Sequence, residues 1–341
     1  MDVARVDIGV ELISSILFFS KHYSITEKFL GNKHAPRITK EYELELTEWI
    51  KPYLKHEVFA YVEELTYKGL FFGRPIEIMC ATDFETMSLR ETLSSLCVEF
   101  SGGRSSIEKL LTLLKDFSEV SDYKSFFQQA KKYYIKPIEY FNNHFDLNKI
   151  IFEINKFYGY DKNSYQIILT DLQCGSYGIH FNDISKRNIF AIYTMNGVTL
   201  LDEKSLESAC GAFSLNILIH EFSHPYVNPL TEKFSEEVNQ YKGAFDKLLA
   251  YKLPGSLSGY GNWEECVDEH IVRAIAIHLA KKIRSSEIEE WHYRRSYNAG
   301  YRYLPFLLEK LVCYDDNRDR YKTFDDFYLE LIKSFSKNSS L

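Results

Sequence analysis

The feature that most constrains this chain is the pentapeptide His220–His224, which reads HEFSH. Residues four apart lie on the same face of an α-helix, so the two histidines can present their imidazoles side by side. The mainly apolar run Leu215–Ile219 comes directly before them and is typical of a buried helix. We therefore expect residues 206–224 to form a helix whose last turn carries an H-E-x-x-H metal site.

This spacing predicts the chemistry of a zinc-dependent hydrolase. Zinc binds neutral imidazole nitrogens and strongly lowers the pKa of a coordinated water. The carboxylate of Glu221 lies beside the two ligands, where it would accept the proton of that water and pass it to the leaving group. We expect one Zn2+ ion, with His220 and His224 as ligands and Glu221 as the catalytic base. The competing interpretation is a polar patch on an amphipathic surface helix.

A third protein ligand is needed if one position on the ion is left for water. The helix expected at Trp263–Arg284 supplies the candidates, and Glu265, Glu269 and Arg273 share one of its faces. The spacing alone leaves Glu265 and Glu269 as alternatives. If Glu265 bound the ion, Glu269 could orient an imidazole from outside the ligand set.

Pro225 directly follows the metal motif. Proline lacks the N–H that would bond to the carbonyl of Glu221, and its ring crowds that carbonyl. We therefore expect the helix to kink or end near His224.

The remainder of the chain divides into two kinds of sequence. Residues 1–155 are predicted to be mainly helical, because their apolar residues recur with the helical period. Residues 156–341 begin with two strand candidates, 165–170 and 188–193, and Asn196-Gly197 is a hairpin signal. The chain is therefore predicted to be α+β and mostly helical. A helical N-terminal region precedes a second domain that holds a small mixed sheet and the metal helix.

Composition excludes several classes of partner. The formal net charge of −7 and the lack of any basic run argue against nucleic acid or an anionic membrane surface. The six cysteines contain no C-x-x-C pair and are expected to be reduced, buried thiols. The acidic N-terminus does not resemble a signal peptide, and no segment approaches the roughly 20 apolar residues of a membrane span. These features predict a cytoplasmic protein. They leave its oligomeric state open.

Val227–Pro229 follows the metal motif His220–His224, and the second helix carries Glu269–Ala274, which reads EHIVRA. With Gly175–Gly178 and Val10–Leu12, these stretches resemble an uncharacterised bacterial family, domain of unknown function 4932. Members of that family look like gluzincin-type metallopeptidases. The resemblance implies a zincin-like catalytic domain, one zinc ion and Glu269 as the third ligand. The sequence departs from the family pattern at Pro225, where a small or polar residue is expected.

The resemblance also implies a peptide or protein substrate. In gluzincins a strand beside the metal helix pairs with the substrate backbone, so Ile189–Tyr193 or the turn near Tyr177 would line the cleft. Tyr177 or Tyr260 would stabilise the oxyanion. The alternative is a non-catalytic, metal-containing protein that binds a peptide or a partner, which the intact Glu221 disfavours. Zinc-dependent hydrolysis of another amide or of an ester is a third hypothesis.

The other histidines have simpler expectations. His270 and His278 lie on the second helix, where a hydrogen-bonded or surface histidine is more common than a second metal ligand. His180 follows the turn near Tyr177 and could approach the cleft.

Overall fold

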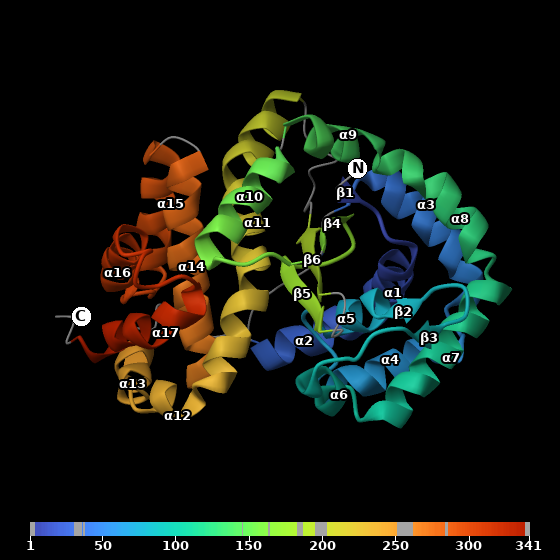
Figure 1. Cartoon of the computed structure of the whole chain (residues 1–341). Coiled ribbons are helices and arrows are strands. Elements are labelled where there is room, and N and C mark those ends of the chain that lie inside the picture. Colours follow the sequence, from blue (N-terminus) through green and yellow to red (C-terminus); the bar gives the residue numbers. More distant parts are fainter. Residues whose placement is uncertain are drawn as a thin grey trace. The chain divides into compact units, whose positions relative to one another are not determined.

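The structure, a computed structural model, describes residues 4–30, 36, 38–144, 146–162, 164–182, 187–194, 203–250, 262–283 and 286–337 (Figure 1). It is mostly helical with a small sheet, as the sequence predicts. The helices are α1 Ile8–Phe19, α2 His22–Leu30, α3 Lys40–Ile50, α4 Glu57–Lys68, α5 Arg74–Cys80, α6 Ser95–Phe100, α7 Arg104–Val120, α8 Tyr123–Ala130, α9 Ile135–His144, α10 Leu147–Tyr158, α11 Glu203–Lys233, α12 Ser235–Asn239, α13 Gly243–Ala250, α14 Trp263–Ile283, α15 Ser286–Asn298, α16 Leu304–Asp316 and α17 Phe324–Ile332. The strands are β1 Ala4–Arg5, β2 Thr82–Asp83, β3 Ser88–Leu89, β4 Ser164–Thr170, β5 Tyr177–Asn182 and β6 Arg187–Thr194.

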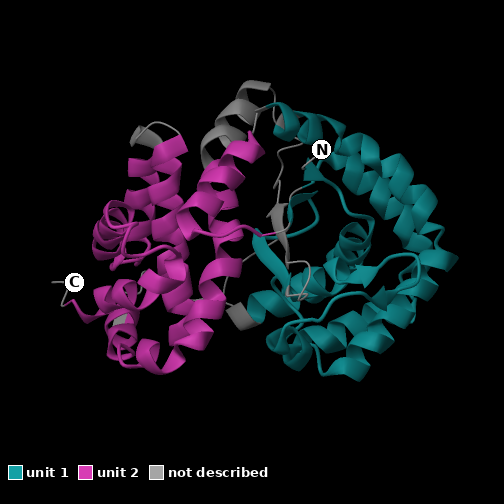
Figure 2. Cartoon of the chain, in the orientation of Figure 1, with its two compact units in different colours: residues 1–145, 163–209 teal, residues 146–162, 210–341 magenta. Residues whose placement is uncertain are grey.

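The chain forms two compact units (Figure 2). Unit 1 consists of residues 1–145 and 163–209, and unit 2 consists of residues 146–162 and 210–341. This division differs from the predicted domains at 1–155 and 156–341, because the sheet joins the N-terminus to the middle of the chain. Local sequence patterns do not indicate which distant strands pair, so they could not predict this division.

The main sheet belongs to unit 1 and has the strand order β1-β4-β6-β5. β4 pairs in parallel with both β1 and β6, and β5 pairs antiparallel with β6, so the sheet is mixed as predicted. The strands expected at 165–170 and 188–193 lie within β4 and β6. The turn expected at residues 174–178 is shorter than predicted, with Gly175 at a positive φ of 96°, because β5 already begins at Tyr177. The hairpin signal at Asn196-Gly197 lies outside the described residues.

A buried carboxyl group lies at the centre of unit 1. Glu11 on α1 is 1% exposed, and its Oε2 accepts hydrogen bonds from the hydroxyls of Tyr42 (3.1 Å) and Tyr134 (2.7 Å). Desolvation raises the pKa of Glu11 to about 7, against these hydrogen bonds, and the nearby Asp171 adds to the rise. Helix α1 therefore carries a titratable group inside the core, which its amphipathic pattern does not reveal.

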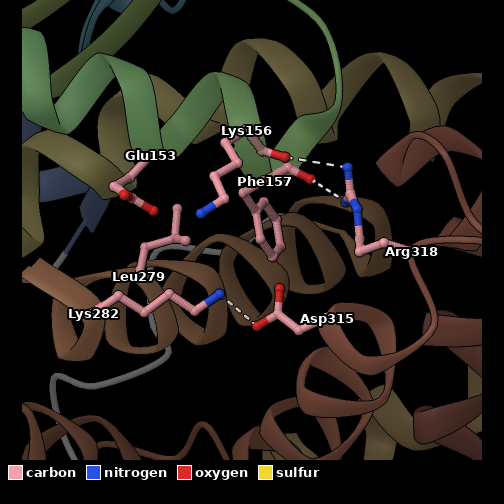
Figure 3. Close-up of a pocket in the computed structure, with 7 residues that line it drawn as sticks. All are labelled: Glu153, Lys156, Phe157, Leu279, Lys282, Asp315 and Arg318. Atoms are coloured by element: carbon pink, nitrogen blue, oxygen red, sulfur yellow. Dashed lines mark hydrogen bonds and ion pairs between the residues drawn. The ribbon is translucent and has the colours of Figure 1, made fainter.

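Unit 2 packs α14 against α10, α15 and α16. A pocket of about 250 Å³ lies where α10, α14 and the end of α16 meet (Figure 3). Its charged side chains hold these helices together: Asp315 accepts from His278 at 2.6 Å and from Lys282 at 2.5 Å. Arg318 donates to the carbonyls of Phe157 (2.7 Å) and Lys156 (3.1 Å), which lie in the last turn of α10. Cations beside a helix C-terminus interact favourably with the helix dipole. The charged side chains of this pocket therefore stabilise the packing of the three helices.

Of the two outcomes expected at Pro225, a kink or an end of the helix, the end near His224 is wrong. α11 continues to Lys233 with Pro225 and Pro229 inside it. A proline in a helix interior costs about 3 kcal/mol or more. Beyond the metal motif, three apolar side chains are at most 4% exposed, and burying each stabilises the fold by roughly 1.5–3 kcal/mol. They are Tyr226, Val227 and Leu230. Tertiary burial thus offsets the effect of the two prolines, which local propensity cannot anticipate.

The broken helical hydrogen bonds of α11 have a specific support. Pro229 has no N–H to donate to the carbonyl of Pro225, and Lys162 donates to that carbonyl instead, at 3.4 Å. The Lys162 ammonium also lies 4.7 Å from the centroid of the Tyr226 ring, and Tyr158 stacks on that ring at 3.8 Å. The end of α10 and the residues after it therefore brace α11 directly beyond the metal motif.

No described helix is both long enough and apolar enough to cross a membrane.

Candidate metal centre

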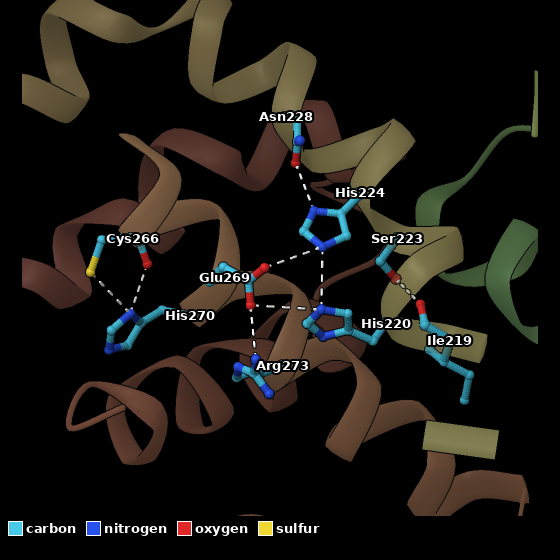
Figure 4. Close-up of polar contacts among 9 residues, drawn as sticks. All are labelled: Ile219, His220, Ser223, His224, Asn228, Cys266, Glu269, His270 and Arg273. Carbon is cyan, nitrogen blue, oxygen red and sulfur yellow. Dashed lines mark hydrogen bonds and ion pairs between the residues drawn. The ribbon is translucent and has the colours of Figure 1, made fainter. Parts of the chain in front are cut away.

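His220 and His224 lie on one face of α11, as their spacing predicts (Figure 4). Their Nε2 atoms are 3.2 Å apart. The helix is anchored by apolar residues that are at most 1% exposed, including Leu218, Ile219 and Phe222. Both imidazoles therefore project from a buried, fixed backbone rather than from a mobile surface turn.

The carboxylate of Glu269 on α14 faces both imidazoles. Its Oε2 lies 3.7 Å from Nε2 of His220, and its Oε1 lies 3.5 Å from Nε2 of His224. Glu265 lies one turn earlier on α14 and is exposed. The spacing left Glu265 and Glu269 as alternative third ligands. In the structure, Glu269 is the one that faces the histidine pair.

These three separations fit the ligand set of a zinc ion. Zn–N bonds of 2.0–2.1 Å and Zn–O bonds of 2.0–2.2 Å place tetrahedral ligand atoms roughly 3.3–3.6 Å apart. The observed distances are 3.2 Å, 3.5 Å and 3.7 Å. Two imidazole nitrogens and the two oxygens of one carboxylate that converge in this way need a cation or a proton among them. Two histidines and one carboxylate also leave a fourth position, the pattern of a catalytic site.

Electrostatics favour the ligand form of His220. Burial lowers the pKa of His220 well below its usual value, and Arg273 and His224 lower it further against the opposing effect of Glu269. The imidazole is therefore neutral at physiological pH, with a lone pair available to a metal ion.

Glu221 lies between the two histidines in sequence and is 7% exposed. A carboxylate oxygen of Glu221 and one ring nitrogen of each histidine all lie within 4.8 Å of one another. The residue is thus beside the histidine pair, where a general base would have to be.

Two side chains that are not themselves candidate ligands contact the candidate ligands. Arg273, one turn beyond Glu269, donates from Nη2 to Oε2 of that carboxylate at 3.0 Å. The guanidinium carbon of Arg273 lies 4.2 Å from the centroid of the Tyr301 ring, a cation–π contact that fixes the arginine. On α11, Asn228 Oδ1 lies 3.1 Å from Nδ1 of His224. The i,i+4 spacing of both pairs was visible in the sequence, but nothing there gave these residues a role.

A buried cluster fixes α11 against α14. Thr231, two turns beyond His224, contacts Asp268 and lies 2.6 Å from the hydroxyl of Tyr328 on α17. Asp268 directly precedes Glu269, and burial raises its pKa to about 8 against the hydrogen bond from Thr231. These contacts therefore fix the position of Asp268, the neighbour of the candidate third ligand Glu269.

Substituting Arg273 is expected to weaken metal binding without removing a ligand. In Arg273→Met the Glu269 carboxylate loses its charge-assisted hydrogen bond. Zinc affinity should therefore fall by about 10-fold, the lower end of the range for residues that hydrogen-bond to a metal ligand. Arg294→Met is the matched control, because Arg294 also donates to a glutamate four residues away but on the exposed surface of α15. Equal zinc affinities for the two variants, measured by competition with a chromophoric chelator, would contradict the expectation.

The remaining candidates that the structure describes belong to β5 and to α14. Tyr177 and His180 are on β5 in unit 1, and the Tyr177 hydroxyl donates to the carbonyl of Cys174. Tyr260 lies outside the described residues. His270 is fully buried with Nδ1 2.7 Å from the carbonyl of Cys266, so it is a hydrogen-bonded core histidine as expected. Burial lowers its pKa to about 4.

Comparison with known proteins places the chain in a family. The family model described as Domain of unknown function (DUF4932) matches residues 3–334, so the chain belongs to this family. No curated protein and no solved structure matches the chain.

Proposed function

We propose that this member of the DUF4932 family is a zinc-dependent metallopeptidase. In this proposal His220, His224 and Glu269 bind a single zinc ion, and Glu221 is the general base. The observation that carries it is the convergence of three side chains from two helices, whose nearest nitrogen and oxygen atoms lie 3.2–3.7 Å apart. A zincin-like catalytic domain and a peptide as substrate are parts of the same proposal, and they rest on the resemblance to gluzincins.

The chemistry divides between the ion and the chain. Bound zinc would lower the pKa of a coordinated water and polarise the carbonyl of the scissile bond. Glu221 accepts the proton from the attacking water and donates it to the leaving amine, so that a neutral amine departs. Arg273 keeps the Glu269 carboxylate oriented. The burial of Glu221 strengthens its interaction with the substrate protons, because little water competes there.

The proposal is tested by metal content and peptide cleavage together. Wild-type protein should bind close to one equivalent of zinc and cleave members of a peptide library. Glu221→Gln should keep the zinc and lose cleavage by at least about 100-fold, since it removes a general base, which contributes 10²–10⁴-fold. Glu264→Gln is the control, because Glu264 is a glutamate on α14 whose Oε1 contacts Asn239 instead of the histidine pair.

The outcomes separate the alternatives. Zinc binding without cleavage by the wild type would overturn the peptidase and leave a metal-containing binding protein. Cleavage of simple esters or non-peptide amides alone would assign a different hydrolase. Absence of zinc at stoichiometric supply would overturn both metal-based functions.

A further inference from the structure

The state of one ring nitrogen decides whether His224 can bind a metal. Neutral imidazole carries its proton on either Nδ1 or Nε2, and only the unprotonated nitrogen can be a ligand. Nε2 is the atom of His224 that faces the site, 3.2 Å from Nε2 of His220 and 3.5 Å from Oε1 of Glu269. The proton must therefore be held on Nδ1.

Asn228 is the residue that meets Nδ1. Its Oδ1 lies 3.1 Å from Nδ1 of His224, one helical turn further along α11 (Figure 4). An amide oxygen only accepts hydrogen bonds, so this contact requires a proton on Nδ1 and leaves the lone pair on Nε2. Among the described residues, this is the one hydrogen bond that the structure gives to the Asn228 side chain.

The supporting residue and the ligand share one helix. The group that accepts a hydrogen bond from the other ring nitrogen of a metal-bound histidine is commonly a carboxylate or a backbone carbonyl. Here the partner lies four residues along α11, between Pro225 and Pro229. The helix persists through both prolines because residues 226, 227 and 230 are buried, and this continuation carries Asn228 into reach of His224. If α11 ended at His224, the contact would be lost.

We propose that Asn228 is a positioning residue that fixes the Nδ1–H tautomer of His224 and so prepares Nε2 as a zinc ligand. This inference rests on the proposed function, since it concerns the same zinc site. It makes the continuation of α11 through its prolines part of the metal site rather than an incidental property of the fold.

Zinc affinity of three variants tests the inference. Asn228→Leu removes the acceptor and should weaken zinc binding by about 10–100-fold, the range for outer partners of metal ligands. Asn228→Asp keeps an oxygen that only accepts, so it should bind zinc at least as tightly as the wild type. Asn148→Leu is the matched control, the same substitution at an exposed asparagine on α10 of the same unit. Affinity is measured by competition with a chromophoric chelator, and the thermal midpoint of the metal-free proteins is recorded alongside.

The results separate this inference from the proposed function. If Asn228→Leu unfolds before zinc is added, Asn228→Ala and the rescue by aspartate decide the question. Equal zinc affinity for wild type and the leucine variant would overturn the role of Asn228 while leaving the zinc site intact. A loss as large in Asn228→Asp as in Asn228→Leu would also overturn it, because the amide N–H would then be the group that matters. If the wild type binds no zinc, the proposed function and this inference fail together.

Discussion

Replacing Glu269 with alanine is expected to lower zinc affinity by more than about 100-fold, beyond the 10–100-fold loss typical of outer partners. The variant keeps both histidines but removes the oxygens that lie 3.5 Å and 3.7 Å from their Nε2 atoms. A tetrahedral zinc ion would then have two protein ligands instead of three, and two waters would complete it. Zinc retained after dialysis against a chelator of known affinity measures the effect.

Glu265→Ala is the matched control for this prediction. Glu265 occupies the same face of α14 one turn earlier, so both variants change helix propensity and net charge equally. Zinc binding should be unchanged in Glu265→Ala. The reverse ranking, with the larger loss in Glu265→Ala, would contradict the assignment of Glu269 as third ligand.

Replacing Glu11 with glutamine is expected to remove a large pH dependence from the stability of unit 1. Burial raises the pKa of Glu11 from 4.5 to about 7 in the folded protein. The folded state thus binds more protons than the unfolded state between these values, and stability falls as pH rises through the folded pKa. At 1.36 kcal/mol per pKa unit, the wild type should lose on the order of 3 kcal/mol between pH 4 and pH 9 relative to the glutamine variant.

Urea unfolding of both proteins across that pH range measures the difference. Glutamine has nearly the same shape as glutamate and still offers an oxygen to Tyr42 and Tyr134. Glu48→Gln on α3 is the control, since Glu48 is exposed and should leave the pH profile unchanged. Parallel profiles for wild type and Glu11→Gln would contradict the prediction that the buried carboxyl titrates within this range.

Local patterns predicted much of the secondary structure. The helical period placed α14 close to its observed bounds, and the two predicted strands correspond to β4 and β6. These predictions succeed because a helix or strand is encoded by residues that are near one another in sequence. β1 was not predicted, because two residues carry no periodicity and the strand exists through its pairing with β4.

The end of α11 shows where local reasoning fails. Proline is a reliable breaker when nothing opposes it, but at Pro225 the buried side chains beyond it hold the helix together. Lys162, more than 60 residues away in sequence, supplies a donor to the carbonyl that Pro229 leaves without its helical partner. No spacing rule could connect these residues.

The sequence by itself determined the histidine pair and the glutamate beside it, because a spacing of four residues fixes their common face on any helix. It also placed the chain in its family, narrowed the candidate third ligand to two acids on one helix by spacing, and favoured Glu269 by the family resemblance. Tertiary structure alone brought Glu269 to the histidines, set Arg273 on Tyr301, and carried α11 past its prolines so that Asn228 meets His224. Those contacts depend on how separate helices pack and on burial that outweighs local preference, and neither can be read from neighbouring residues.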